Sequence, residues 1–425
     1  MPDIEALASP SGMQNPMRTR KAPPLTRRGG IAGFTCLILP LLAFALPVVA
    51  GAAQTLRVPQ DKPTIQAAID AARDGDTVLV APGTYYEQVK LSGKSLTLAS
   101  TFLTNQDHEQ IEATILAGHG GGKEAGAIIT VDKSAGPETR IIGFTIQNGG
   151  HGILNYGRIQ VLHNRLKGNR DALSFESGAA EVRWNTFEGN RDDGIDIDGA
   201  SEAIIEDNII SNNRDDGIEV RLHKYNGPVL NIVIRRNVFS GNLEDGLQLI
   251  DYPDKSDRTF WIERNVFDKN AMVAIGSMQD GNTKENYEGA DLPEAVVIVN
   301  NTFVGGPYGV TGGGNMVVLN NVFAGITKIA LKRVLGDSAA GYNLLWNNGV
   351  DLEECDLTTD TFVAQHPLLD EHSRPKSGSP AINAGAASFN YNGETLTLPA
   401  GSYSGPAPDL GAFETGKVES AASTP

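Results

Sequence analysis

Cysteine is scarce in this chain of 425 residues, which contains only two. We expect the segment that holds Cys36 to be removed, which leaves Cys355 alone. A single cysteine cannot form an internal disulfide. The stability of the protein must therefore come from its apolar core and from hydrogen bonds.

Basic residues are also in deficit, with 35 Lys and Arg against 51 Asp and Glu. Residues 1–52 hold five basic and two acidic residues, so the remainder has 30 basic and 49 acidic residues and a net charge of −19. Such a surface repels nucleic acid and anionic membranes. We therefore expect no nucleic-acid partner, and a polyanionic ligand would need a cation or a local basic patch to bind.

Several catalytic motifs are missing. The sequence has no serine nucleophile elbow, no zinc-ligand spacing, no phosphate-binding loop and no dinucleotide fingerprint. We expect no organic cofactor. Beyond the N-terminal segment no apolar run is long enough to cross a bilayer, so we expect no membrane span after that segment is removed.

The N-terminal segment has the pattern of an export signal. Basic residues between Arg18 and Arg28 precede an apolar run from Ile31 to Ala50, and small residues follow it. This order of basic, apolar and small residues is typical of a cleaved signal peptide. We predict a signal peptide over residues 1–52 and a secreted or periplasmic protein.

An internal repeat dominates the middle of the chain. Its unit has alternating apolar residues, an Asn, a Gly-Asn pair, an acidic turn and then Gly-Ile or Gly-Leu. The first Asn of this pattern recurs at the same place in each unit, at intervals of 20 to 36 residues. The repeat is clearest in Val182 to Ile197, Ile205 to Val220, Ile234 to Leu249 and Ile262 to Met278, and the repeated asparagines are Asn164, Asn185, Asn208, Asn237, Asn265, Asn301, Asn321 and Asn343.

Short alternating strands cannot enclose a core alone, so they stack as parallel ladders in a solenoid. Asn favours turns, and stacked Asn amides can bond to one another. Most units also place a Phe two residues after the Asn, which predicts a buried aromatic stack of Phe187, Phe239, Phe267, Phe303 and Phe323. We predict an all-β solenoid over residues 53–350, with a closing segment and tail over residues 351–425.

The open ends of a solenoid need caps. Ile65, Ala68, Ile69 and Ala72 recur at helical spacing after Pro63, which predicts a capping helix over residues 63–72. Residues 64–87, with Gly-Asp-Thr-Val-Leu-Val-Ala-Pro-Gly-Thr-Tyr, resemble the opening of pectin-lyase-like β-helix proteins of bacteria. Residues 379–385 and 408–414 resemble the closing signature of these proteins. The resemblance implies a single-stranded right-handed parallel β-helix, a fold that hosts lyases, hydrolases, epimerases and adhesins.

Three successive turns carry paired carboxylates, and adjacent coils stack about 4.8 Å apart. We predict two columns of acids, with more carboxylates facing outward on the following strands. The paired carboxylates are Asp192 and Asp193, Asp215 and Asp216, and Glu244 and Asp245; the outward acids are Asp196, Asp198 and Glu219. Like charges this close need compensation. Three interpretations remain open: pairing with Arg191 and Arg214, calcium bound by Asp196, Asp198 and Glu219, or a catalytic acid pair among Asp193, Asp215, Asp216 and Asp245.

Insertions follow the same strand in three consecutive repeats, over residues 221–228, 251–258 and 279–293. Insertions at equivalent points emerge on one face, so we expect them to line a groove beside the acids. Their basic residues are candidates for proton transfer, and their aromatic, basic and acidic residues suit a sugar polymer. The candidate bases are Arg221, His223 and Lys224, and the candidate substrate-binding residues are Tyr225, Asp251, Tyr252, Lys255 and Arg258.

Residues 190–197 and 214–218 also look like the Asn-Thr-Asp-Gly-Ile-Asp and Gly-Asp-Asp-Cys-Ile stretches of polygalacturonase-type hydrolases. That resemblance implies catalytic carboxylates at Asp193, Asp215 and Asp216. The next turn departs from it, with Glu244, Asp245 and Gly246 where that family has Gly-His-Gly, and no Arg-Ile-Lys follows. We predict a polysaccharide-active protein, with a calcium-assisted uronate lyase ahead of a hydrolase or epimerase, and a non-catalytic carbohydrate-binding scaffold as the alternative.

Overall fold

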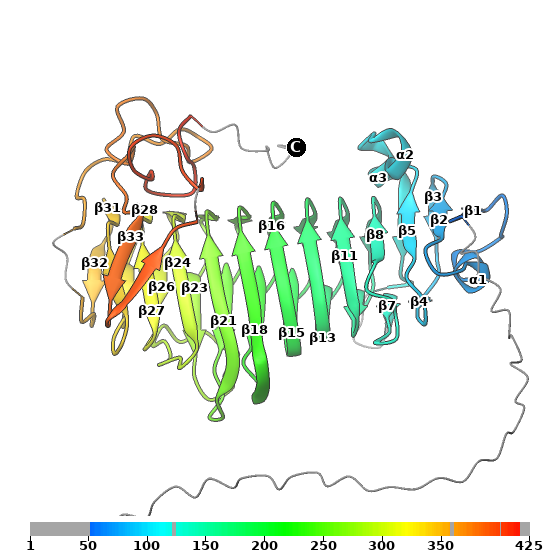
Figure 1. The fold of residues 1–425 in the computed structure, drawn as a ribbon, viewed down its shortest axis with the longest axis horizontal. Coiled ribbons are helices and arrows are strands. Elements are labelled where there is room, and N and C mark those ends of the chain that lie inside the picture. Colours follow the sequence, from blue (N-terminus) through cyan, green and yellow to red (C-terminus); the bar gives the residue numbers. More distant parts are fainter. Residues whose placement is uncertain (1–51, 121–124, 358–360, 400, 417–425) are drawn as a thin grey trace, which may run out of the picture. The chain divides into compact units, whose positions relative to one another are not determined.

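The computed structural model describes residues 52–120, 125–357, 361–399 and 401–416. The predicted signal peptide lies outside these residues, except for Ala52. Within them, no helix is long and apolar enough to cross a membrane. The described chain forms a right-handed parallel β-helix whose coils follow one another along a single axis (Figure 1).

From β2 onward the coils contribute strands to three faces, and neighbouring strands within each face are parallel. The first face contains β4 (Val89–Leu91), β7 (Ala127–Val131), β10 (His151–Asn155), β17 (Ile218–Arg221), β20 (Leu247–Ile250), β23 (Val273–Met278), β26 (Tyr308–Thr311), β29 (Ile329–Lys332) and β32 (Val350–Glu353). The second contains β1 (Thr55–Val58), β2 (Thr77–Val80), β5 (Thr97–Ser100), β8 (Thr139–Ile142), β11 (Arg158–Leu162), β18 (Tyr225–Arg235), β21 (Ser256–Glu263), β24 (Ala295–Val299), β27 (Met316–Leu319) and β30 (Ala339–Gly341).

Two longer strands bend from the first face into the second, so one hydrogen-bonded sheet includes both faces. They are β13 (Asp171–Arg183) and β15 (Ile195–Glu206). The third face is a separate sheet of three- and four-residue strands: β3 (Gly83–Tyr85), β6 (Thr114–Ala117), β9 (Thr145–Gln147), β12 (Arg165–Lys167), β14 (Thr186–Glu188), β16 (Ile209–Ser211), β19 (Val238–Ser240), β22 (Val266–Asp268), β25 (Thr302–Val304), β28 (Val322–Ala324) and β31 (Leu344–Trp346).

The predicted asparagine column lies at the corner between the second and third faces. Asn208 donates from Nδ2 to Oδ1 of Asn237 at 3.0 Å, and Asn237 donates in the same way to Asn265 at 3.0 Å. Each Oδ1 also accepts the backbone N–H of the preceding Asn, as in Asn208 N to Asn237 Oδ1 at 3.0 Å. The ladder runs without a break from Asn164 to Asn343, so buried turn amides are satisfied by the next coil.

The core is continuous from Val58 to Leu345, as the repeat predicted. The predicted aromatic stack is present at its centre: the rings of Phe239 and Phe267 are 4.6 Å apart, and those of Phe303 and Phe323 are 4.4 Å apart. Phe187 is also fully buried, but Ile210 separates it from Phe239 in the ladder. One apolar column therefore extends along the axis of the solenoid.

The first coil is closed by α1 (Ile65–Ala71), where the spacing predicted a helix. Thr64 caps it by accepting the N–H of Ala67 at 3.1 Å, and Ile65 and Ile69 are buried against the first strands. Two further helices, α2 (Phe102–Asn105) and α3 (Glu109–Ala113), were not predicted because each is shorter than two helical turns.

The closing segment includes a hairpin that packs on the outside of the solenoid. Its antiparallel hairpin, β33 (Ser388–Tyr391) and β34 (Glu394–Thr397), returns along the second face. Phe389 and Leu396 pack there with Trp261, Val297 and Val317. Figure 1 shows this hairpin in orange to red across the later strands of the second face. The hairpin therefore packs on β21, β24 and β27 of the second face.

Candidate functional site

The predicted column of acids is present at the start of the first-face strands. The Oδ1 atom of Asp193 accepts the backbone N–H of Asp216 at 3.1 Å, and Asp216 accepts that of Asp245 at 2.7 Å. Asp245 continues the pattern by accepting the N–H of Val273 at 2.9 Å. These three carboxylates are at most 5% exposed. The column therefore bonds one coil to the next, as the asparagine ladder does at another corner.

A second row of acids lies beside this column. Asp196 and Glu219 are directly paired in neighbouring strands, and Ile195 and Ile218 next to them point into the core. Carboxylate oxygens of Asp193, Asp196 and Glu219 all lie within 4.8 Å of one another. We call these three residues, with the adjacent Asp198, the acidic cluster. Asp196 and Glu219 are only 6% and 4% exposed, so neighbouring side chains shelter them although they face outward.

A further group of oxygens within 4.8 Å joins Asp215, Asp216 and Glu244 in the turns that precede these strands. Asp215 and Glu244 are more exposed than the buried Asp216. Burial and the neighbouring Glu244 raise the pKa of Asp215 to about 8. The two predicted columns thus differ: one is buried and bonded to backbone, and the other is nearer to solvent.

Burial and mutual repulsion perturb the acidic cluster strongly. Burial, with the charges of Asp198 and Glu219, raises the pKa of Asp196 to about 8. Burial also raises the pKa of Glu219 to about 7, although Arg221 opposes this. Burial and then Asp216 raise the pKa of Asp193 well above its usual value. The cluster therefore favours either protons or a cation at neutral pH.

Arg221 supplies part of the compensating charge. Its guanidinium lies 2.5 Å from Glu219 Oε1, 3.4 Å from Asp198 Oδ2 and 3.8 Å from Asp196 Oδ1. Burial alone would lower the pKa of Arg221, but these carboxylates raise it further. Arg221 therefore stays protonated and cannot serve as the predicted base. It is suited to neutralising negative charge on the cluster or on a ligand.

His223 and Tyr252 border the cluster from two consecutive insertions. Their rings are 4.5 Å apart, and His223 Nδ1 lies 3.8 Å from Asp198 Oδ1. The His223 side chain is 45% exposed, so a ligand can reach it. Burial raises the pKa of Tyr252, which therefore keeps its hydroxyl proton. The structure thus brings together a neutral acid, an imidazole and a carboxylate cluster.

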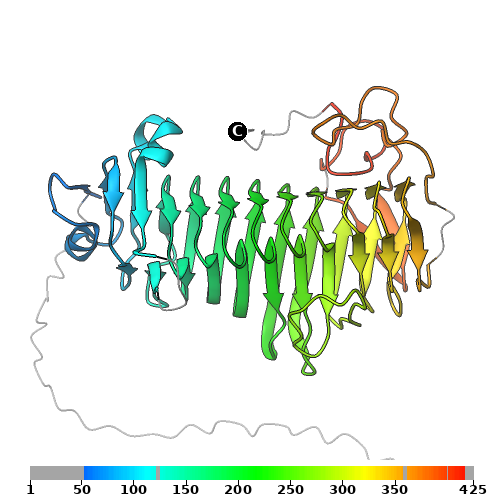
Figure 2. The ribbon, with the colours of Figure 1, turned by 180° about the vertical axis from the view of Figure 1, so that it is seen from behind.

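The three insertions follow β17, β20 and β23, so they emerge along one edge of the first face, as predicted. They appear together at the lower edge of the solenoid in Figure 2. Backbone bonds connect them, including Gly281 N to Asp251 O at 2.7 Å. The insertions therefore support one another at the end of the strands that carry the cluster.

Other predicted residues of these insertions are engaged elsewhere. Lys224 pairs with Asp254 at 2.8 Å, and Lys255 lies 3.9 Å from Asp257; both lysines are well exposed. Arg258 is 4% exposed and donates to the carbonyl of His223 at 2.9 Å, with Tyr225 beneath its guanidinium at 5.7 Å. Through these contacts Arg258 holds the first insertion in place. Its burial leaves little surface for a substrate. Burial and then Glu294 raise the pKa of Asp251 to about 6.

Three residues of this face were not predicted from the sequence: His151, Asp171 and Glu285. His151 begins β10 and lies 3.1 Å from the buried Asp171, which extends the acidic column by one coil. Glu285 of the third insertion reaches back over β23: a Cβ at Gly276 would be 2.8 Å from Glu285 Oε2 and 2.2 Å from Asp245 Oδ2. Of these three residues, only His151 and Asp171 could have been found from the sequence, because they occupy equivalent positions in successive repeats.

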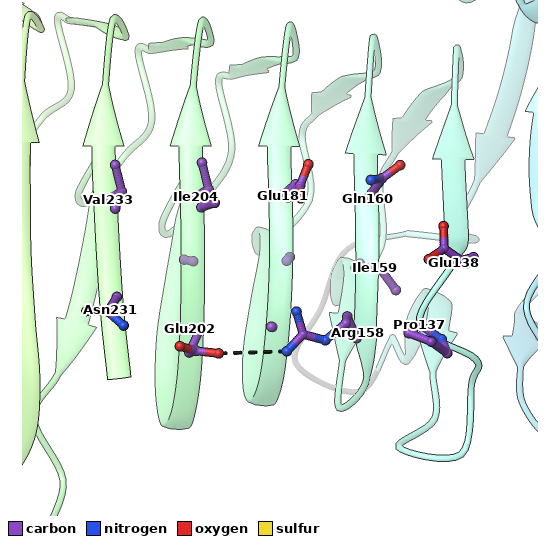
Figure 3. Close-up of a pocket in the computed structure, with 13 residues that line it drawn as sticks. Pro137, Glu138, Arg158, Ile159, Gln160, Glu181, Glu202, Ile204, Asn231 and Val233 are labelled. Atoms are coloured by element: carbon purple, nitrogen blue, oxygen red, sulfur yellow. Dashed lines mark ion pairs between the residues drawn. The ribbon is translucent and has the colours of Figure 1, made fainter. Parts of the chain in front are cut away.

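A separate hollow of about 400 Å³ lies on the second face, over β11, β13, β15 and β18. Figure 3 shows its side chains projecting from β11, β13, β15 and β18, with Arg158 3.7 Å from Glu202. Gln160, Glu181 and Ile204 lie in one row across it. None of the predicted site residues lines this hollow. Glu138, Glu181 and Glu202 do line it, but among the described residues they do not form a group that could hold a metal ion.

Comparisons with known proteins agree with this architecture. The model of a right-handed β-helix region matches residues 126–323. The crystal structure of pectate lyase Pel9A superposes with a TM-score of 0.51 at 17% identity, over 82% of this chain and 90% of that one. The catalytic unit of an α-1,3-glucanase from Streptomyces thermodiastaticus gives a TM-score of 0.52 at 16% identity, over 75% and 69%. No curated protein matches the sequence. The predicted resemblance to pectin-lyase-like β-helices is thus confirmed at the level of the fold.

Proposed function

We propose that this β-helix protein is an exported enzyme that binds a uronate-containing polysaccharide across its first face and cleaves it by calcium-assisted β-elimination. The observation that carries the proposal is the acidic cluster, which lies between a protonated Arg221 and the partly exposed His223. The fold is one that hosts polysaccharide lyases and hydrolases, but fold alone does not assign activity.

The donor set of the cluster fits calcium. Ca²⁺ prefers several carboxylate and carbonyl oxygens. Asp196 Oδ1 and Asp198 Oδ1 are buried and have no hydrogen-bond partner among the described residues, whereas Glu219 Oε1 is paired with Arg221 at 2.5 Å. Asp193, Asp196 and Glu219 would hold the ion, with Asp198 beside them. When bound, calcium would neutralise a uronate carboxylate and so make the adjacent C5 proton more acidic.

The protein's own residues suit the remaining steps. His223, whose Nδ1 lies 3.8 Å from Asp198 Oδ1, would take the C5 proton through an unprotonated ring nitrogen. The electron pair of that C–H bond forms the C4–C5 double bond as the C4–O bond breaks. Tyr252, whose burial raises its pKa, would donate its proton to the leaving oxygen. Arg221 would hold the uronate carboxylate, since its guanidinium stays charged.

A lyase fits these contacts better than the predicted hydrolase. The hydrolase interpretation places acid and base at Asp193, Asp215 and Asp216, but Asp193 and Asp216 are 5% and 1% exposed. Their Oδ1 atoms also accept backbone N–H groups of the next coil. A water and a glycosidic bond between two carboxylates would need more room than these side chains leave.

A non-catalytic polysaccharide-binding protein is the second candidate. The specific observation in its favour is that Arg221 already lies within 3.8 Å of three carboxylates, so the cluster has a compensating charge of its own. In that case the first face would bind sugar without turnover. The lyase proposal differs from it by requiring both calcium and product.

One experiment separates these functions. The protein is incubated with polygalacturonate, alginate and a neutral glucan, with calcium or with a chelator, while unsaturated-product absorbance and reducing ends are followed together. We expect calcium-dependent absorbance with a uronate polymer, its loss in Asp196→Asn, and its retention in Glu202→Gln on the second face. Reducing ends without absorbance would indicate a hydrolase. Binding without either product would indicate a non-catalytic protein and overturn the proposal.

A further inference from the structure

The acidic column ends in an aromatic and basic group of residues toward the C-terminal coils. Asp245 bonds to Val273, and Val273 is paired with Tyr308 in the next coil, which is paired in turn with Ile329. Tyr308 and Lys328, the residue before Ile329, therefore lie along the same edge of the first face as the acids. The site and this group share one line parallel to the solenoid axis.

The two aromatic rings and the cation are in direct contact. The rings of Tyr287, from the third insertion, and Tyr308 are stacked at 4.5 Å with 21° between their planes. Lys328 Nζ lies 5.2 Å from the centroid of each ring. Val273 and Ile329 form the apolar support beneath them. A cation within 6 Å of a ring is attracted to its face, so the ammonium group is held in a defined place.

Lys328 is exposed and, among the described residues, has no carboxylate partner, which distinguishes it from the ion-paired Arg221, Lys224 and Lys255 and from Arg258, which is buried and donates to a backbone carbonyl. Arg221, Lys224 and Lys255 each lie within 4 Å of a carboxylate. In the part of the chain that the structure describes, no ion pair is found for Lys328, and its side chain is exposed. An uncompensated cation on tyrosine rings stands out on a chain whose net charge is −16. Burial raises the pKa of Tyr287, so its hydroxyl remains a donor for hydrogen bonds.

We propose that Lys328, Tyr287 and Tyr308 form a subsite that binds a uronate residue of the same polysaccharide, several sugar residues away from the acidic cluster. This inference rests on the proposed substrate class, though not on cleavage. Glu219 and Lys328 are separated by four coils, which is about 19 Å at the spacing of stacked strands. The ammonium of Lys328 would pair with the uronate carboxylate, and the tyrosine hydroxyls would donate to sugar oxygens. Only an oligomer that spans both places can use the subsite.

Calorimetry with defined oligomers tests the subsite in the full chain. The probes are a galacturonate hexamer, a mannuronate hexamer, the corresponding dimers and neutral maltohexaose, each titrated in a chelator so that the hexamers are not cleaved during the measurement. Lys328→Met keeps the apolar contact with the two rings but removes the charge. We expect it to weaken the binding of one of the two uronate hexamers about tenfold, which is the effect of losing one hydrogen bond to a charged group. Binding of its dimer should not change. The matched control is Lys269→Met, because Lys269 is an exposed lysine on the third face.

The outcomes separate this inference from the proposed function. Unchanged hexamer affinity in Lys328→Met, with normal cleavage, would overturn the subsite and leave the lyase in place. Lysine-dependent hexamer binding without any cleavage would retain the subsite and reject the lyase. If the wild-type protein binds no uronate hexamer, or binds maltohexaose equally well and independently of Lys328, the subsite is wrong.

Discussion

The Oδ1 atom of Asp216 accepts the backbone N–H of Asp245 at 2.7 Å, so a carboxylate of one coil holds the main chain of the next. The same bond recurs from Asp193 to Asp216. At the corner between the second and third faces, the neutral side-chain amides of the asparagine column accept the backbone N–H groups instead. A column of buried carboxylates costs more folding free energy, because it places like charges close together and away from water. The column therefore has a structural role that an uncharged acceptor could also fill.

Asp216→Asn tests that statement, because Asn keeps the oxygen acceptor and removes the charge. Burial and the charge of Asp245 raise the pKa of Asp216, so the repulsion should be relieved. Without calcium at pH 8, we expect the free energy of unfolding to rise by about 1–2 kcal/mol. Asp216→Ala removes the acceptor and should lower it by a similar amount. Chemical denaturation measures both; equal losses in the two variants would contradict the role of repulsion.

The asparagine ladder should be more sensitive to truncation than exposed asparagines are. Asn237 is 1% exposed and donates to Ile205 O and Asn265 Oδ1 while it accepts two bonds from Asn208. Asn237→Ala leaves buried partners without bonds, so we expect a loss of at least about 2 kcal/mol in unfolding free energy. Asn231→Ala, on the exposed second face, is the matched control. A loss equal to that of the control would show that the ladder is dispensable.

The capping helix should be required for stability. Ile69 is 1% exposed at the contact of α1 with the first strands. Ile69→Asp would bury an unpaired charge there, which costs several kcal/mol. We expect a clearly lower melting temperature by circular dichroism, while Asp70→Asn, on the exposed side of the helix, should have little effect. Identical melting of the two variants would show that α1 does not seal the core.

The stability of the calcium-free protein should depend on pH in an unusual direction. The folded-state pKa is about 8 for Asp196 and about 7 for Glu219, against ordinary values of 3.8 and 4.5. Between these values the folded state binds more protons than the unfolded state, so stability falls as pH rises. We expect the melting temperature in a chelator to decrease between about pH 5 and pH 8. Calcium should reverse this trend because it replaces protons. A melting temperature that rises over this range in the chelator would contradict the raised pKa values.

Arg221→Gln separates calcium binding from charge compensation by the protein itself. Removing the guanidinium, which lies 2.5 Å from Glu219, leaves the cluster uncompensated. We expect lower stability in a chelator and calcium affinity about tenfold higher, since a competing cation is lost. Calorimetric titration with calcium provides the measurement. The control variant is Lys224→Gln; Arg258→Gln is unsuitable because Arg258 holds the first insertion in place.

Unchanged calcium affinity in Arg221→Gln would show that the ion does not bind at the acidic cluster.

The sequence alone determined the coil, the direction of its side chains and the alignment of successive coils. The repeated Asn, the Phe two residues after it and the alternation around Ile195 and Ile218 are local patterns, and parallel stacking transfers them unchanged from coil to coil. For the same reason the alignment of Asp193, Asp216 and Asp245 followed from their place before Gly-Ile or Gly-Leu.

Tertiary structure decided which of these side chains a ligand can reach. The exposure of a side chain depends on how insertions fold back, and that depends on contacts between residues far apart in sequence. Arg258 was expected to bind substrate but is buried and bonded to the first insertion. Lys328, which precedes β29, contacts the ring of Tyr287, more than 40 residues away in the sequence. The acids followed from repetition, but the basic and aromatic residues around them have no repeat, so their positions could only come from packing.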